Sequence, residues 1–522
     1  MQPQSPASRR QFLRHSAAMT ALVGSGAAPV ALNLAALGTA AAQSAPAGGE
    51  YRALVCLFLF GGNDSFNMVL PLERSNWRAY TLTRTQTPDP IALMPPYTEP
   101  VLTAPVGSPA RLGGILPIIP NNVRSGPYAL HPLLRSTQGL FSTEGRLAVL
   151  SNIGPLIMPT TKAQYAQASH PKPARLFSHN DQQNTWQALG PEGTTRGWAG
   201  LMGDLLASQN ARPVFTAISA SGNAVWLAGD TIKQYQVSAG GAVPLGVNTA
   251  GQLYGSADVG AALHRLVTTP TSIHPFDADI AAVARRSIDA ELVLRTALRP
   301  PSDPAFGTPP ATGGYNPSND PKLRYDNPLT GVAAPNGLAQ QFQVVARMID
   351  AGQRGLTGVS RQVFFVSLGG FDTHDFQNRN QADLMARIDH ALKYFDDALG
   401  NLAVRNQVTT FTASDFGRTF TSNGDGTDHG WGSHHFVMGG AVRGGGLFGS
   451  FPRLSVKNAN NNNFDGSPDQ IGNGSLLPTS SVDQLGFTLG RWMGLSEGQL
   501  LDIFPNLANF NAGRRNLGFM NA

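Results

Sequence analysis

Acidic and imidazole side chains gather in the C-terminal part of the sequence, directly after two apolar, β-rich runs. Asp372 and His374 follow the first run, and Asp415 follows the second. Asp428 and His429 come next, in a Gly-rich stretch. Carboxylate oxygen and neutral imidazole nitrogen together form a ligand set that zinc and related divalent cations take in proteins. This pattern predicts half of a metal site, with the other half further upstream.

A similar polar cluster follows the apolar, aromatic run at 51–60. Asp64 lies there, in the segment GGNDSFN. In open α/β sheets, ligands bind just beyond the carboxyl ends of the strands. The alternative is an ordinary Gly-Asn turn in which Asp64 only caps the chain. Because polar clusters recur at three predicted strand ends, we interpret Asp64 as a further metal ligand.

Candidate catalytic groups surround these ligands in the sequence. Ser178 precedes a helical run, and a hydroxyl there lies in the positive field of the helix N-terminus, where an anion or a nucleophile is favoured. Equally, Ser178 could be an N-cap with Asp181 closing a capping box. His179 could act as a general acid or base, or support a ligand from behind. Arg418 could clamp a substrate oxygen or pair with Asp415.

The elements that must position these residues alternate between buried strands and amphipathic helices. Strands are predicted at 51–60, 147–153, 363–368 and 408–412, and helices at 197–208, 280–298, 338–351, 381–399 and 480–495. Alternation of this kind predicts an α/β fold with a doubly wound, mostly parallel sheet and helices on both faces. Residues 43–522 are expected to form a single domain with long loop insertions, including a Pro/Gly-rich one near 300–335.

The N-terminal segment predicts export. Arg9 and Arg10, followed by Phe12 and Leu13, form a twin-arginine (Tat) motif ahead of an uncharged run, so we expect residues 1–42 to be a Tat signal peptide. An uncleaved membrane anchor is the alternative; no later run is long and apolar enough to span a bilayer. Loss of three arginines lowers the formal net charge from +5 to +2, which gives no reason to expect a nucleic-acid partner. The single cysteine, Cys56, excludes an intramolecular disulfide.

Several sequence blocks together resemble a known family. The blocks are LFGGNDSFNMVLP, FSHNDQQNTWQ, LGGFDTHDFQ, ASDFGRT and GTDHGWGSHHFVMGGAVRGG, with the Tat leader before them. They are similar to those of the DUF1501 family of exported bacterial proteins, a distant branch of the alkaline phosphatase/sulfatase-like superfamily. The resemblance implies an alkaline phosphatase-like sheet, one or two divalent cations (Zn or Mn) at its carboxyl edge, and a nucleophile at a helix start.

Carried over to this sequence, the resemblance gives both matches and departures. It implies metal ligation by Asp64, Asp372, His374, Asp415, Asp428 and His429. It implies Ser178 as the nucleophile, with Ser65 as the weaker candidate. The spacing Asp-x-His at 372–374 is shorter than the usual Asp-x-x-x-His. Phe416 stands where a histidine would follow Asp415, and the pair at 428–429 could restore the missing imidazole.

Two functions follow from these expectations. The first is a periplasmic or secreted, metal-dependent hydrolase of phosphate or sulfate esters, with a small anionic ester as substrate and the Tat translocase as partner during export. The second is a non-catalytic, metal-stabilised binding or surface-assembly protein with the same fold. The density of acids and imidazoles at strand ends favours the first, and the altered Asp-His pair with the long loops favours the second.

Overall fold

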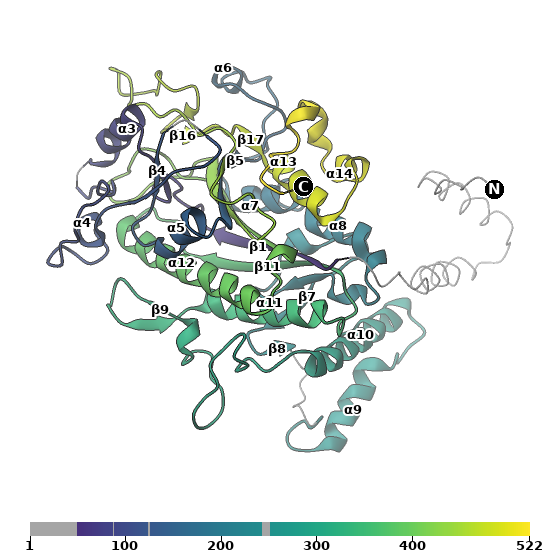
Figure 1. The fold of residues 1–522 in the computed structure, drawn as a ribbon. Helices are drawn as coiled ribbons and strands as arrows, with labels where there is room; N and C mark the ends of the chain where they lie inside the picture. Colours follow the sequence, from purple (N-terminus) through teal and green to yellow (C-terminus); the bar gives the residue numbers. More distant parts are fainter. Residues whose placement is uncertain (1–49, 87, 124–125, 243–250, 522) are drawn as a thin grey trace. The chain divides into compact units, whose positions relative to one another are not determined.

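A ten-stranded sheet organises the chain in the computed structural model, which describes residues 50–86, 88–123, 126–242 and 251–521 (Figure 1). The part from Glu50 to Ala522 is one compact unit. The predicted signal peptide at 1–42 lies outside the described residues.

The centre of the sheet is parallel. β1 (Arg52–Phe60) lies between β11 (Arg361–Gly369) and β12 (Val408–Ser414), and both pairings are parallel. Beyond β11 come β6 (Ala217–Ser219), β7 (Tyr235–Ser238) and β8 (Gly241–Ala242). Beyond β12 come β13 (Ser433–Met438) and β5 (Leu147–Gly154), with β14 (Leu447–Phe448) and β17 (Ser480–Ser481) both paired to β5. The predicted mostly parallel α/β sheet is confirmed, with antiparallel pairs at β12–β13, β13–β5 and β7–β8.

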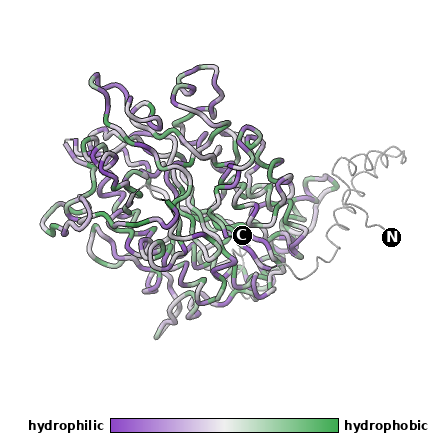
Figure 2. The backbone as a smooth tube through the Cα atoms, turned by 45° about the horizontal axis from the view of Figure 1, so that its top comes forward, coloured by the Kyte–Doolittle hydropathy of each residue, from purple (hydrophilic) through white to green (hydrophobic). Residues whose placement is uncertain are grey.

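Helices cover both faces because β1 is apolar on both. Val55 and Leu57 pack on one side with α5 (Arg135–Ser142), α10 (Pro275–Ala297), α11 (Gly337–Gln353) and α12 (Gln377–Asn401). Leu54 and Phe58 pack on the other with α7 (His179–Ala188), α8 (Trp198–Leu206), α13 (Val482–Met493) and α14 (Glu497–Ile503). Side chains alternate between faces along a strand, so a continuous apolar run indicates burial on both. Figure 2 shows hydrophobic backbone segments, in green, in the middle of the described chain.

Shorter helices and strands lie outside the main sheet and the helices that cover it. They are the helices α3 (Arg74–Arg84), α4 (Pro109–Leu112), α6 (Lys162–Tyr165) and α9 (Ala257–Thr268), and the small-sheet strands β2 (Val69–Pro71), β3 (Leu116–Ile118), β4 (Tyr128–Leu130), β9 (Arg324–Asp326), β10 (Ala333–Pro335), β15 (Gln470–Ile471) and β16 (Ser475–Leu476). The predicted insertion at 300–335 contains the β9–β10 hairpin. Within the described residues, none of the helices is long and apolar enough to cross a membrane.

The parallel strands bring distant residues to one edge. β1, β11 and β12 run in the same direction in register, so Phe60, Gly369 and Ser414 end near one another. The polar segments that follow each strand therefore meet at the carboxyl edge of the sheet, where α/β proteins place their sites.

Candidate metal centre

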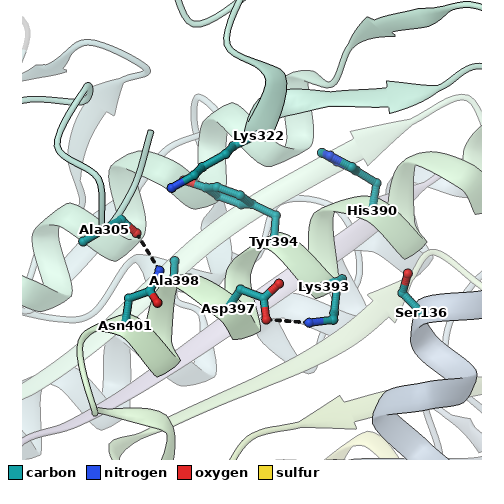
Figure 3. Close-up of a pocket in the computed structure, with 9 residues that line it drawn as sticks. All are labelled: Ser136, Ala305, Lys322, His390, Lys393, Tyr394, Asp397, Ala398 and Asn401. Atoms are coloured by element: carbon teal, nitrogen blue, oxygen red, sulfur yellow. Dashed lines mark hydrogen bonds and ion pairs between the residues drawn. The ribbon is translucent and has the colours of Figure 1, made fainter. Parts of the chain in front are cut away.

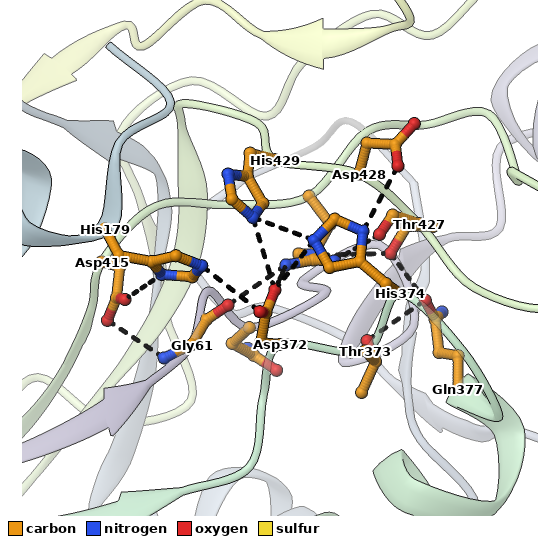
Figure 4. A network of polar contacts seen from close by, with 12 residues as sticks. Gly61, His179, Asp372, Thr373, His374, Gln377, Asp415, Thr427, Asp428 and His429 are labelled. Carbon is orange, nitrogen blue, oxygen red and sulfur yellow. Dashed lines mark hydrogen bonds and ion pairs between the residues drawn. The ribbon is translucent and has the colours of Figure 1, made fainter. Parts of the chain in front are cut away.

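Three imidazole rings converge on one carboxylate at this edge (Figure 4). The Nε2 atoms of His374 and His429 lie 3.1 and 3.4 Å from Oδ1 of Asp372. Nε2 of His179 lies 3.4 Å from Oδ2 of the same carboxylate. The Nε2 atoms of His374 and His429 are 3.0 Å apart. One ligand atom from each of His179, Asp372 and His429 falls within 4.8 Å of the others, so this group could hold a metal ion.

Each ring is oriented by an oxygen atom on its other nitrogen. Nδ1 of His179 lies 2.7 Å from Oδ2 of Asp415, and Nδ1 of His374 lies 3.3 Å from Oδ1 of Asp428. Nδ1 of His429 lies 2.7 Å from the carbonyl oxygen of Phe177. A carbonyl or an ionised carboxylate only accepts hydrogen bonds, so the Nδ1 atoms of His179 and His429 carry the protons and their Nε2 atoms present lone pairs. Partners of this kind fix the orientation of histidines that ligate metals.

The inward lone pairs of His179 and His429 suit a cation. The Nε2 atoms of His374 and His429, 3.0 Å apart, share a hydrogen bond in which His374 donates to the lone pair of His429, and a cation would take the place of that proton. Zinc holds imidazole nitrogen at 2.0–2.1 Å in a tetrahedron, which puts neighbouring ligand atoms about 3.3–3.4 Å apart. The nitrogen–oxygen separations of 3.1–3.4 Å around Asp372 are of this size. With neutral imidazoles, three carboxylates and one guanidinium (Arg418) leave two negative charges, which a divalent cation would balance.

The elements explain why these side chains meet. Asp372 and His374 follow β11, Asp415 follows β12, and His179 is the first residue of α7. His429 lies in the loop before β13 and forms an isolated β-bridge with Arg418. Four segments, spread along the chain from His179 to His429, therefore contribute to one centre.

Gly61 allows the closest of these approaches. It follows β1 at φ +115°, and a Cβ there would lie 2.3 Å from the backbone nitrogen of Asp372. Its N–H donates to Oδ1 of Asp415 at 3.1 Å, and its carbonyl accepts from Arg418 at 3.1 Å. Only glycine combines this φ with the absence of a side chain, so the tight turn after β1 joins both neighbouring strand ends.

Arg418 positions Asp372 from inside the protein. The guanidinium is fully buried, and Nη1 donates to Oδ1 of Asp372 at 2.7 Å as well as to Gly61. Nε and Nη2 donate to the side chain and the carbonyl of Thr427. Four of the five N–H donors are used within the protein, and the guanidinium is enclosed where the predicted clamp on a substrate oxygen would need it to be open. Its carboxylate partner is Asp372 instead of the predicted Asp415.

The protonation of these groups follows from their neighbours. The hydrogen bond that His179 donates to Asp415 raises the pKa of His179, against the opposing effect of burial. Burial lowers the pKa of His429, which favours the neutral imidazole that a metal requires. Burial acts to raise the pKa of Asp372, but the hydrogen bond and charge of Arg418 outweigh it and leave this pKa lowered.

One side of the centre faces solvent. The side chains of Asp372 and His374 are 45% and 41% exposed, whereas that of Asp415 is fully buried. A small molecule can reach the ligand atoms from the side of His374, while Asp415, which holds His179, lies inside.

Asp64, predicted as a ligand, lies in a different network. Both of its oxygens accept from the buried guanidinium of Arg84, at 2.5 and 3.1 Å. Oδ2 also accepts from Gln377 at 2.5 Å. Arg84 thus supplies the positive charge that a cation would have supplied, and the prediction of Asp64 as a ligand is wrong. Asp415 and Asp428 likewise hold outer ring nitrogens rather than facing the central carboxylate.

The predicted nucleophiles are engaged or enclosed. Ser178 directly precedes α7, but its hydroxyl donates to Oδ2 of Asp181 at 2.8 Å and caps no backbone N–H. Ser65 is 1% exposed, and its hydroxyl has no hydrogen-bond partner among the described residues. Neither hydroxyl has a hydrogen bond to the ligand atoms of the metal centre.

The supporting roles of three groups were not predicted from the sequence. The carbonyl of Phe177 carries no sequence signal, because any residue has one. Gln183, which donates to Asp415 at 2.7 Å, lies one helical turn after His179, a spacing that places both on one face of α7. Phe416 packs its ring against His179 and His429, with centroids 4.8 and 4.6 Å away, so it forms an apolar wall where a further imidazole was expected.

A cavity of about 280 Å³ beside α12 is separate from this centre (Figure 3). Its charged groups are already paired: Lys393 with Asp397 at 2.5 Å, and Lys322 with the carbonyl of Pro304 at 2.6 Å. None of its lining residues belongs to the metal centre.

Comparison with known proteins gives one family match. No curated protein matches the chain. Among 23 matching solved chains, a mutant of the alkaline phosphatase PafA shares 11% sequence identity at a TM-score of 0.25; the match covers 72% of this chain and spans 64% of the enzyme's length. Residues 330–504 match the family described as "Protein of unknown function (DUF1501)". That region supplies Asp372, His374 and His429 of the metal centre, and His179 comes from outside it.

Proposed function

We propose that this chain holds one divalent metal ion at its carboxyl sheet edge and hydrolyses phosphate or sulfate esters there. The observation that carries the proposal is the convergence of three Nε2 atoms on one carboxylate, each ring oriented from behind by an oxygen. The ester class rests on the sequence resemblance described above. A single cation is proposed because Arg84 already neutralises Asp64.

His179, His374, His429 and Asp372 would hold the ion. Imidazole nitrogen with one carboxylate suits Zn, and Mn is the alternative among cations that accept this set. A bound divalent cation supplies Lewis-acid polarisation of an ester oxygen and lowers the pKa of a coordinated water.

The remaining residues set the geometry. Asp415 keeps the proton of His179 on Nδ1, Phe177 does the same for His429, and Arg418 fixes the carboxylate of Asp372. Asp428 holds His374 on the exposed side, where an anionic ester would arrive.

A second function is favoured by the number of ligands. Four protein donors close a tetrahedral site, and closed sites are typical of structural zinc, whereas catalytic zinc keeps an open position. The hydroxyl of Ser178, the predicted nucleophile, donates to Asp181, which also favours a non-catalytic role. A non-catalytic protein stabilised by the same ion is therefore the alternative.

The test combines metal content with turnover. Full-length protein purified without chelator should contain about one equivalent of Zn or Mn by mass spectrometry. It should hydrolyse at least one of p-nitrophenyl phosphate, bis-p-nitrophenyl phosphate and p-nitrophenyl sulfate. His429→Ala should lose both the ion and the turnover, because a ligand is removed, while the exposed His264→Ala on α9 keeps both.

The outcomes separate the candidates. One equivalent of metal without turnover of any ester supports the stabilising role, especially if chelation lowers the melting temperature. Wild-type protein that binds no divalent cation contradicts both.

A further inference from the structure

A second cavity, away from the metal centre, combines apolar walls with a buried carboxyl group. It has a volume of about 300 Å³ and is lined by Leu156, Ile157, Leu189, Asp483 and Asn506, together with Pro155, Pro173 and Pro191. Thr185 and Leu189 bring the far end of α7 to it, roughly 15 Å along the helix from His179. Nothing in the proposed hydrolysis uses this cavity.

Asp483 is the unusual member of the lining. The residue is 2% exposed, and its Oδ1 has no hydrogen-bond partner among the described residues. It also has no ion pair there: the only cation that lines the cavity, Lys172, donates instead to the carbonyl of Gln167 at 2.7 Å. The carboxyl group does have a hydrogen bond with the side chain of Asn506, so Oδ1 is the oxygen left without a partner. A buried carboxyl oxygen without a partner is costly, and such atoms occur where a ligand or ion completes them.

The walls define what could complete it. Three prolines and the side chains of Leu156, Ile157 and Leu189 offer no charge, so they suit a short hydrocarbon chain. Oδ1 of Asp483 offers a hydrogen-bond acceptor that becomes a full charge when the group ionises. Burial raises the pKa of Asp483 to about 7. At mildly alkaline pH the carboxyl group is therefore ionised, and a cation beside it would interact with its negative charge.

We propose that this cavity binds a small organic ammonium ion, with its N–H groups on Asp483 and its alkyl chain against the proline and leucine walls. Apolar pockets with one or two placed polar groups are the usual form of small-ligand sites. The ammonium would satisfy the orphaned oxygen through a charge-assisted hydrogen bond.

The probe is n-butylammonium chloride, titrated into full-length protein by calorimetry at pH 8. Saturable binding is expected, with 1-butanol, which has the same alkyl chain and no charge, at least tenfold weaker. Asp483→Asn should weaken n-butylammonium binding at least tenfold, because the amide carries no charge. Asp502→Asn, an exposed acid on α14, is the matched control and should leave binding unchanged.

A second variant keeps the proposal testable if Asp483→Asn misfolds. Ile157→Trp retains the carboxyl and fills the cavity from a half-buried wall position, so it should also weaken binding at least tenfold. Absence of saturable binding to the wild type overturns the proposal. Unchanged affinity in Asp483→Asn or in Ile157→Trp, with folding verified by circular dichroism, overturns it as well.

Discussion

Asp64 forms an ion pair with Arg84, whereas the sequence predicted that Asp64 would bind a metal ion. The pair is fully enclosed, and Arg84 also donates to the carbonyls of Thr419 and Phe420 and to the side chain of Asn67. All the donors of this guanidinium are therefore directed at oxygen atoms of the protein. A buried charge pair of this kind is difficult to break, because removing one partner leaves the other uncompensated.

Arg84→Met tests this pairing. The variant should be destabilised by about 3–5 kcal/mol, because Asp64 would remain buried without a partner. The double variant Asp64→Asn/Arg84→Met should recover part of this loss, and neither should change metal content, since Asp64 is not a ligand. Urea denaturation with metal analysis measures both. Loss of the ion in either variant would return Asp64 to the ligand set.

Asp483 predicts a pH dependence of stability. Burial raises its pKa from the ordinary 3.8 to about 7, so the folded chain keeps a proton that the unfolded chain releases above about pH 4. Stability contributed by this group therefore falls as pH rises from about 4 to about 7 and then stays level. Asp483→Asn should gain free energy of unfolding relative to the wild type across this window, while Asp502→Asn shows no trend. Denaturation at pH 5, 6, 7 and 8 is the measurement; a flat difference for Asp483→Asn contradicts it.

At this scale the sequence predicts residue types better than roles. Asp372 and Asp415 both follow apolar strands, and nothing in the sequence distinguishes the carboxylate at the centre from the one behind His179. Which of the two carboxylates lies at the centre depends on positions that differ by a few ångströms and are fixed by the packing of Gly61 and Phe416. The partner of Asp64 was also hidden, because Arg84 closes a helix that carries no motif.

Among the elements, the turn after β1 controls the site most directly. Gly61→Ala should displace the segment of Asp372, because φ is +115° and a Cβ would lie 2.3 Å from its backbone nitrogen. We expect a loss of more than about 1 kcal/mol in stability and a clear loss of metal affinity. Gly369→Ala, at the end of β11, is the control, because a Cβ there meets nothing within 4 Å. Equal metal affinity in the two variants would contradict the role given to Gly61.

The strands and helices themselves could largely be predicted. The runs at 51–60 and 363–368 are apolar on both faces, which indicates central strands, and both lie at the middle of the sheet. The direction of β13 could not be predicted, since periodicity carries no information about whether a strand is parallel. The position of the loop before β13, which carries His429, depends on that direction, so it could not be predicted either.

For the whole molecule, export remains a prediction from the sequence. Arg9→Lys combined with Arg10→Lys should leave the protein in the cytoplasm with its leader attached, because Tat recognition reads both arginines. Arg14→Lys is the control and should be exported normally. Cell fractionation with immunoblotting is the measurement, and periplasmic accumulation of the double variant would contradict the Tat interpretation.

The positions of the three imidazoles along the chain have a consequence for unfolding. His179, His374 and His429 enclose segments of 195 and 55 residues (374 − 179 and 429 − 374), and the chain has a single cysteine. An ion held by all three would act as a cross-link in a molecule that cannot form an internal disulfide. On the chain-entropy treatment of cross-links, closing a loop of the longer length removes about 5 kcal/mol of freedom from the unfolded ensemble. The ion would then restrict the unfolded chain far more than its four contacts suggest, for as long as the unfolded histidines retain it.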